Sequence, residues 1–220
     1  MPIDISWIPP KKTISVFFNF FFLKVYGKKI PIFFAMKSKL FVMSAPSGAG
    51  KTTLKDLVIK EFPDMVYSIS ATTRAPREGE VDGTHYFFKS RDEFKRMIEN
   101  NELVEWNEVH GNFYGTPKSF VEKMLSEGKR VLFDLDVFGK VNFDKVYPEA
   151  IGILILPPSL EILEQRLRNR HTDSDEVISL RLHNARKEIE FAKQHGKYEY
   201  KIVNDNLDDA VNQLRKILSE

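Results

Sequence analysis

Apolar residues follow two kinds of spacing along this chain, and the two alternate from about residue 40 onward. Short runs that suit strands lie at 40–43, 66–70, 103–109, 130–136, 150–156 and 200–203. Between them, apolar residues recur every three or four positions, as on one face of a helix, at 51–62, 91–100, 117–127, 160–170, 175–195 and 207–218. This alternation predicts an α/β fold built on a doubly wound, mostly parallel sheet.

The first strand and the first helix are joined by the glycine-rich segment APSGAGKT, residues 45–52. Gly48 and Gly50 leave the backbone bare, so successive N–H groups can point at phosphate oxygens, and the helix directs its positive end to the same place. Lys51 can reach the outer phosphates, and the Thr52 hydroxyl suits a magnesium ion. The order of strand, glycine turn, Lys-Thr and helix predicts a phosphate-binding loop rather than an ordinary strand–turn–helix connection.

The helix after this loop carries Leu54, Leu57, Val58 and Phe62 at helical spacing, and we expect it to end before Pro63. In the helix at 91–100, Phe94, Met97 and Ile98 are expected to face inward. Residues 110–116, with the sequence HGNFYGT, are expected to form a glycine-bounded turn.

The densest polar stretch, SATTRAPREGEVDGTHYFF, runs from residue 70 to residue 88. A loop of this length that carries arginines and hydroxyl groups is usually functional or disordered. Because it returns to a strand-like segment, we expect an ordered binding loop.

Two carboxylates, Asp134 and Asp136, close the buried strand at 130–136. In a parallel sheet, ligands bind at the carboxyl ends of the strands. These carboxylates and the phosphate loop are therefore expected at one edge of the sheet.

Composition changes this picture little. The 220 residues carry 33 basic and 31 acidic side chains, a net charge of +2, with no basic block of the kind that coats nucleic acid. The absence of cysteine excludes a disulfide framework and thiolate metal sites, and it fits a reducing compartment such as the cytoplasm.

The N-terminal segment differs from the rest of the chain. Its apolar run, 14–23, has about half of the ~20 residues that a membrane-spanning helix needs, and no small-x-small cleavage site follows it. We expect residues 1–35 to be a non-functional or disordered extension ahead of Met36; a weak membrane-surface or targeting segment is the alternative. No stable membrane insertion is expected.

Several separated motifs resemble one family. APSGAGKTT, SATTRAPREGEVDGTHYF, LVEWNEVHGNFYGT, LFDLDVFG, LPPSLEILEQRLRNR and KIVND are similar in order and spacing to the guanylate kinases, which are ATP:GMP phosphotransferases of the P-loop kinase class. The resemblance covers residues 36–220. It implies a core at 36–69, 120–160 and 188–220, a GMP-binding insert at 70–119, a helical lid at 161–187, and Mg2+ as cofactor with ATP.

The resemblance also implies roles for individual residues. The implied ATP-binding residues are Ala45, Pro46, Ser47, Gly48, Ala49, Gly50, Lys51, Thr52, Thr53 and Asn204. The implied GMP-binding residues are Ser70, Arg74, Arg77, Tyr86, Glu105, Tyr114, Thr116 and Asp134. The implied catalytic cations are Lys51, Arg166, Arg170 and Arg181, and the implied metal ligands are Thr52 and Asp136.

Hydrogen-bond chemistry supports the assignment of the base readers. The pairing edge of guanine offers two donors, N1–H and the N2 amine, and one acceptor, O6. Glu105 can accept from both donors and Ser70 can donate to O6, whereas adenine would leave such buried groups unpaired at a cost of about 1–3 kcal/mol each. This pattern predicts a preference for GMP over AMP; it does not indicate whether dGMP is a comparable substrate, or what the oligomeric state is.

Three positions depart from the family pattern: Ala45 in place of glycine, Phe138 in place of glutamine and His171 in place of glycine. None removes a charge that the reaction needs. Two other functions stay open at this point, a guanylate-kinase-like module that binds peptides without catalysis and a kinase of the same fold with another acceptor. The intact Gly48, Gly50, Lys51 and Thr52 argue against the first.

Overall fold

The computed structural model describes residues 22–25, 28–31, 39–109, 111–169 and 173–220. Its centre is a five-stranded sheet in the order β11-β10-β3-β9-β4, and every neighbouring pair of these strands is parallel. The strands are β3 (Leu40–Ser44), β4 (Met65–Tyr67), β9 (Arg130–Asp134), β10 (Ile151–Leu156) and β11 (Tyr200–Val203). The doubly wound parallel sheet that the alternating pattern predicts is confirmed.

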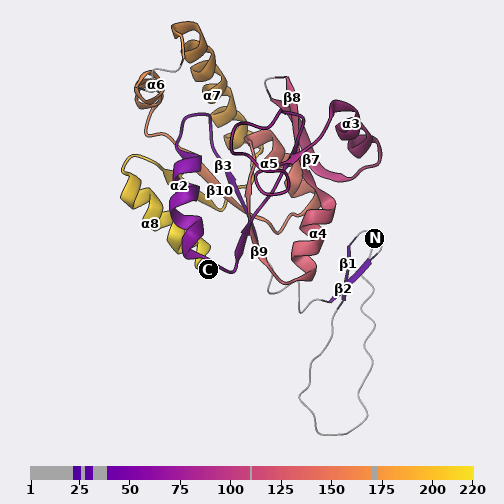
Figure 1. The fold of residues 1–220 in the computed structure, drawn as a ribbon. Helices are drawn as coiled ribbons and strands as arrows, with labels where there is room; N and C mark the ends of the chain where they lie inside the picture. Colours follow the sequence, from indigo (N-terminus) through magenta and orange to yellow (C-terminus); the bar gives the residue numbers. More distant parts are fainter. Residues whose placement is uncertain (1–21, 26–27, 32–38, 110, 170–172) are drawn as a thin grey trace, which may run out of the picture.

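Helices cover both faces of this sheet, which explains why β3 is apolar at successive positions. Phe41 and Met43 pack on one face with residues of α2 (Lys51–Val58) and α8 (Leu207–Leu218). Leu40 and Val42 pack on the other face with residues of α4 (Lys118–Ser126) and α5 (Val137–Val146). In Figure 1, α2 and α8 accordingly lie on the opposite side of β3 from α4.

A second, four-stranded sheet lies beside the first, in the order β6-β5-β8-β7. Its strands are β5 (Ala71–Thr72), β6 (Phe87–Phe88), β7 (Leu103–Val109) and β8 (Asn112–Pro117). The helix α3 (Arg91–Glu99) packs on it through Phe94, which is fully buried, and through Met97 and Ile98, as the sequence predicts. This sheet and the helix make up most of residues 70–119.

Two further helices form the other projection of the molecule. The helices α6 (Leu160–Arg168) and α7 (Asp175–His195) pack against each other through Leu163, Leu167, Ile178 and Ala185. Figure 1 shows them at the same end of the molecule as the loop that follows β3.

Near the N-terminus, β1 (Phe22–Val25) and β2 (Lys28–Pro31) form an antiparallel pair. Most of the apolar run at 14–23 lies outside the described residues, so the expectation for residues 1–35 stays a prediction. None of the described helices is long and apolar enough to cross a bilayer.

One local expectation is wrong, and two local features were not expected. Residues 112–117 are not a turn but the strand β8, because Phe113 and Tyr114 pair with Glu108 and Asn107 of β7, and Gly111, at φ 76°, lies between the two strands. Leu57 is 47% exposed because α2 packs along one side only. The helix α5 has no counterpart among the expected elements, since its apolar residues do not follow a clear helical spacing. Asp136 is its N-cap.

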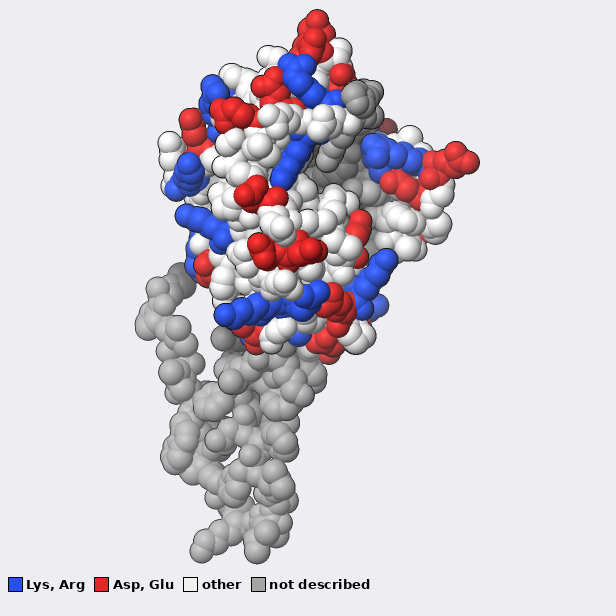
Figure 2. Space-filling view, turned by 90° about the vertical axis from the view of Figure 1, so that its left-hand side faces the viewer, with Lys and Arg blue, Asp and Glu red and all other residues white. Residues whose placement is uncertain are grey.

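The described surface carries mixed charge. Figure 2 shows Lys and Arg side chains interspersed with Asp and Glu on the face that it presents, as the net charge of +2 suggests. No single sign of charge dominates this face, so the groups that bind a charged ligand are expected in the cavities at the edge of the sheet.

Candidate active site

The loop between β3 and α2 has the backbone geometry of an anion-binding turn. Gly48 and Gly50 have φ angles of 91° and 94°, in the left-handed region that favours glycine. Gly50 is also the N-cap of α2, so the loop leads directly into the positive end of the helix. Under the loop, the buried Asn204 donates from Nδ2 to the Ala49 carbonyl oxygen at 2.8 Å.

Gly50→Ala is expected to damage this loop, because the new Cβ would lie 2.3 Å from Asn204 Nδ2 and the residue would hold an unfavourable positive φ. We expect a loss of unfolding free energy of about 2 kcal/mol or more and weaker ATP binding, measured by thermal unfolding and by titration with ATP. Gly79→Ala is the matched control, since Gly79 has a φ of 80° and nothing within 4 Å of its Cβ position. Equal losses in the two variants would show that contact with Asn204 does not constrain Gly50.

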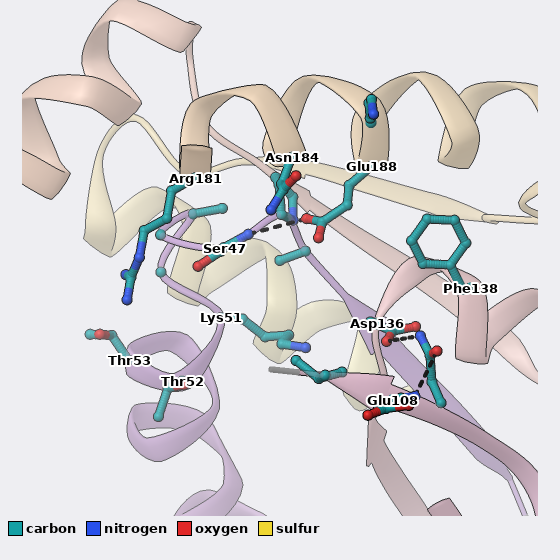
Figure 3. A pocket seen from close by; sticks show the side chains of 18 residues that line it. Ser47, Lys51, Thr52, Thr53, Glu108, Asp136, Phe138, Arg181, Asn184 and Glu188 are labelled. Atoms are coloured by element: carbon teal, nitrogen blue, oxygen red, sulfur yellow. Dashed lines mark hydrogen bonds between the residues drawn. The ribbon is translucent and has the colours of Figure 1, made fainter. Parts of the chain in front are cut away.

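The loop forms one wall of a cavity of about 630 Å3, a size typical of small-molecule sites. All the residues 45–53 that the sequence assigns to ATP line it. From the opposite side, Arg181, Asn184 and Glu188 of α7 point into the same space (Figure 3).

Lys51 lies between the loop and the strand β9. Its ammonium group forms an ion pair with Asp134 Oδ1 and donates to the Leu135 carbonyl oxygen at 3.1 Å. The other carboxylate oxygen of Asp134, Oδ2, accepts a hydrogen bond from the Tyr67 hydroxyl at 3.1 Å. Burial, and then the charge of Asp134, raise the pKa of Tyr67, so this phenol keeps its proton and acts as the donor.

Glu188 brings a carboxylate to the loop. Its Oε2 accepts from the Ser47 backbone N–H at 3.4 Å, as the dashed line in Figure 3 shows. Burial and the charge of Asp136 raise the pKa of Glu188, while the Ser47 N–H and Lys51 act in the other direction. An acidic side chain thus already contacts one of the backbone amides that the resemblance assigns to phosphate.

Asp136 is held by two donors at the start of α5. The Gly139 N–H donates to its Oδ1 at 2.6 Å and Asn107 Nδ2 donates to its Oδ2 at 2.9 Å. Asp136 and Thr52 both line the larger cavity. Among the described residues there is no group of three or more His, Cys, Asp or Glu with metal-binding geometry. One carboxylate and one hydroxyl still fit Mg2+, which keeps several waters and takes substrate phosphates as ligands.

A second cavity opens on the other side of Asp136. It is lined by Ser70, Tyr86, Glu105, Tyr114 and Asp134, five of the residues that the sequence assigns to GMP. Tyr86 and Tyr114 meet edge to face at 6.1 Å between ring centroids.

Glu105 is the buried carboxylate of this second cavity, with only 7% of its surface exposed. Thr116, itself fully buried, donates from Oγ1 to Glu105 Oε1 at 2.6 Å. The pKa of Glu105 is raised to about 7, mainly by burial; the Thr116 hydrogen bond opposes this shift and the charge of Asp136 adds to it. Its second oxygen, Oε2, faces Gly139, where an added Cβ would lie only 2.9 Å away.

Arg74 lies beside the two tyrosines, with its guanidinium 5.3 Å from the Tyr86 ring centroid. Glu80 holds Arg74 Nη2 at 2.8 Å and also accepts from the Arg77 backbone N–H at 2.7 Å. These contacts lower the pKa of Glu80 to about 2. Arg77 itself is exposed, so the structure brings Arg74 but not the Arg77 side chain against the tyrosines.

The remaining assigned residues are spread more widely. Arg166 Nη2 donates to the Asp205 carbonyl oxygen at 3.4 Å, and Arg181 lies 3.4 Å from Asp173 Oδ2. Arg170 and His171 lie outside the described residues. Asn204 is placed beneath the phosphate loop, in contact with its backbone.

Several polar residues of these two cavities and their rim were not predicted from sequence, among them Tyr67, Glu80, Asn107 and Glu188. Glu80 had the best available signal, because it lies within the polar stretch that carries Arg74 and Arg77. Asn107 and Tyr67 lie in strands, where period-two spacing predicts the face of the sheet on which a side chain lies but not the residue that it contacts. Glu188 reaches the loop from 141 positions away, which no local pattern reports.

Comparison with known proteins agrees with this geometry. A family model described as guanylate kinase matches residues 37–220. The chain is 47% identical over 183 residues to a guanylate kinase of Carboxydothermus hydrogenoformans, covering 83% of this chain and 88% of that relative. It is 44% identical over 186 residues to a guanylate kinase of Synechocystis, covering 84% and 96%.

A solved structure supports the same assignment. The crystal structure of guanylate kinase from Anaplasma phagocytophilum is similar with a TM-score of 0.65 and 33% sequence identity, covering 83% of this chain and 85% of that chain. The family model spans far more than half of the chain, and sequence and fold agree with it. This chain belongs to the guanylate kinase family.

Proposed function

We propose that this chain transfers the γ-phosphoryl group of ATP to GMP, giving ADP and GDP, with ATP in the larger cavity and GMP in the smaller one. The observation that carries this proposal is that the two cavities share the residues Asn107, Val109 and Asp136. Ligands in two cavities with a common wall can bring a donor and an acceptor phosphate together, and such alignment supplies most of the catalysis in phosphoryl transfer.

Recognition of guanine is assigned to Glu105 and Ser70. An ionised Glu105 accepts from guanine N1–H and N2, and Ser70 donates to O6. Thr116 occupies part of the hydrogen-bonding capacity of Glu105 Oε1 and fixes the orientation of the carboxylate. The burial of Glu105 makes a mismatched base costly, because an unpaired polar group in such a place has no water to bind.

The raised pKa of Glu105 predicts a pH dependence of GMP binding. Above about pH 7 the carboxylate is ionised and accepts both guanine donors, whereas below it the added proton removes one acceptor. The KM for GMP should therefore rise as pH falls through about 7, approaching tenfold per pH unit, while the KM for ATP changes less. Steady-state kinetics between pH 5.5 and 8.5 measure this.

Thr116→Val should move this profile to higher pH, because it removes the hydrogen bond that stabilises the ionised carboxylate. Glu105→Gln is the control, since it cannot titrate and leaves only the titration of GMP itself. A profile in Glu105→Gln identical to that of the parent would contradict the assignment of the pH dependence to Glu105.

The GMP phosphate is assigned to Arg74, Arg77, Tyr86 and Tyr114. Arg74 supports this assignment because it lies over the Tyr86 ring and is held by Glu80. Arginine presents parallel donors that match phosphate oxygens. Arg77 is exposed and would have to turn toward the phosphate when GMP binds.

The phosphoryl group itself needs charge neutralisation rather than a base, because the GMP phosphate is already nucleophilic. The loop amides and Lys51 would hold the β- and γ-phosphates, and Arg166, Arg170 and Arg181 would approach from the lid. Thr52 and Asp136 would hold Mg2+, which when bound supplies positive charge to the phosphate oxygens. Asn204 would support ATP binding indirectly, by fixing the conformation of the loop, since its side-chain amide donates to the Ala49 carbonyl oxygen.

We assign residues 36–69, 120–160 and 188–220 to the core, 70–119 to the GMP-binding insert and 161–187 to the lid, with residues 1–35 outside the catalytic unit. The assignment of the insert is supported by the four-stranded sheet and α3, which lie between Ala71 and Pro117. A cytoplasmic location fits the lack of cysteine.

The test of this proposal is ADP formation with GMP, dGMP, AMP, CMP and UMP as acceptors in turn, with Mg2+ present. GMP should be the best of the four ribonucleotides by at least about tenfold in kcat/KM over AMP. ADP formation greatest with another acceptor would indicate a kinase of different specificity, and GMP binding without turnover would indicate the non-catalytic module.

A further inference from the structure

Tyr67 ends β4 at the edge of the parallel sheet and lines the smaller cavity. Its ring is half-buried, and its hydroxyl donates to Asp134 Oδ2 at 3.1 Å. The second oxygen of the same carboxylate forms the ion pair with Lys51. Asp134 thus has two partners, one on each oxygen.

The helix α2 contacts this pair at two points. Lys51 and Lys55 are four residues apart and so lie on one side of the helix. Lys51 contacts Asp134, and Lys55 Nζ lies 4.4 Å from the centroid of the Tyr67 ring. The ring of Tyr67 therefore supports the helix, whereas its hydroxyl acts on the carboxylate only, and the two roles can be separated by mutation.

Binding of ATP must change this arrangement, because Lys51 cannot hold Asp134 and the outer phosphates equally well. When Lys51 leaves, Asp134 loses a cationic partner in a partly buried place, which costs free energy. With ATP bound, a hydroxyl that still donates to Asp134 Oδ2 reduces that cost. Without ATP, the same hydrogen bond takes up part of the negative charge of Asp134 and so weakens the ion pair between Asp134 and Lys51.

We propose that Tyr67 is a positioning residue that holds Asp134 when Lys51 transfers from this carboxylate to the triphosphate, and so raises the affinity for ATP. The inference rests on the proposed function, since it takes Lys51 as the phosphate ligand. It adds a hydrogen-bond donor on β4 to the ATP site, although Tyr67 itself lines the smaller cavity.

Calorimetric titration of the full chain with MgATP tests this. Tyr67→Phe keeps the ring under Lys55 and removes the hydroxyl, and it should weaken MgATP binding about tenfold, which corresponds to about 1.4 kcal/mol. Tyr200→Phe is the matched control, because its hydroxyl bonds the exposed Glu220 at the other end of the chain, and it should change the affinity less than twofold.

A merely structural role of Tyr67 is tested by repeating the substitution in variants that lack the ion pair between Lys51 and Asp134. In the Lys51→Met and Asp134→Asn backgrounds, Tyr67→Phe should change the affinity for MgATP less than twofold. The second background keeps the measurement possible if Lys51→Met binds MgATP too weakly to titrate.

The inference is overturned by unchanged affinity in Tyr67→Phe, by an equal loss in the Asp134→Asn background, or by a loss confined to GMP, which would mean that the hydroxyl contacts GMP instead. The parent protein separates this from the proposed function. If the parent binds MgATP and phosphorylates GMP while Tyr67→Phe is indistinguishable from it, only the role of Tyr67 fails.

Discussion

Lys51→Met should lower kcat by about 10²–10³-fold, the loss typical of removing one charged or hydrogen-bonding contact from a transition state. The methionine keeps most of the length of the side chain and removes its charge. The structure adds a second consequence: Asp134 would face the triphosphate without its cationic partner and would repel it. We therefore expect the KM for ATP to rise as well, by about tenfold.

Steady-state ADP formation, with ATP varied at saturating GMP, measures both effects. Lys60→Met is the control, because Lys60 is exposed in the short helical turn Ile59–Glu61 that follows α2, away from both cavities. If Lys51→Met retains more than about a tenth of the parent kcat, the loop does not hold the transferring phosphate in the way proposed here.

Glu105→Gln should erase most of the preference for GMP over AMP. The glutamine amide presents one acceptor and one donor group, so it cannot satisfy the two donors of guanine, whereas its N–H can donate to the N1 acceptor of adenine. We expect kcat/KM for GMP to fall about 10–100-fold, as for one or two unpaired buried groups, and kcat/KM for AMP to rise. Both constants come from the acceptor series.

Glu102→Gln provides the matched control three residues earlier, where the carboxylate is exposed and bonded to Asn100. It should leave both acceptors unchanged. An unchanged GMP/AMP ratio in Glu105→Gln would remove Glu105 as the base reader and leave Ser70 or a main-chain group in that role.

The sequence predicted features that arise from local order. The glycine turn between an apolar run and an amphipathic helix requires the backbone conformations that Gly48 and Gly50 adopt, so the loop was visible in eight residues. The position of Asp134 and Asp136 followed from the rule that parallel strands present their carboxyl ends at one edge. Glu105 was assigned on hydrogen-bond chemistry, and its deep burial strengthens the discrimination that this chemistry predicts.

Features that depend on distant contacts could not be predicted in the same way. The ion pair of Lys51 with Asp134 and the contact of Glu188 with Ser47 join segments more than 80 positions apart. A turn was expected at 110–116 because Gly111 and Gly115 are typical of loops, and the pairing of β8 with β7 is not visible in local sequence. The partners of a carboxylate influence its pKa, and these partners often come from segments that are distant in the sequence. Local sequence therefore does not predict such pKa values.

Two adjoining cavities that share Asn107, Val109 and Asp136 are proposed to align two nucleotides, ATP on the loop and GMP beside Glu105. A dinucleotide in which adenosine and guanosine are joined through five phosphates tests this most directly, because it can occupy both cavities at once. We predict that it binds with a stoichiometry of one and competes with both ATP and GMP in initial-rate inhibition. Competition with only one of the two substrates, or binding of two molecules per chain, would contradict the claim.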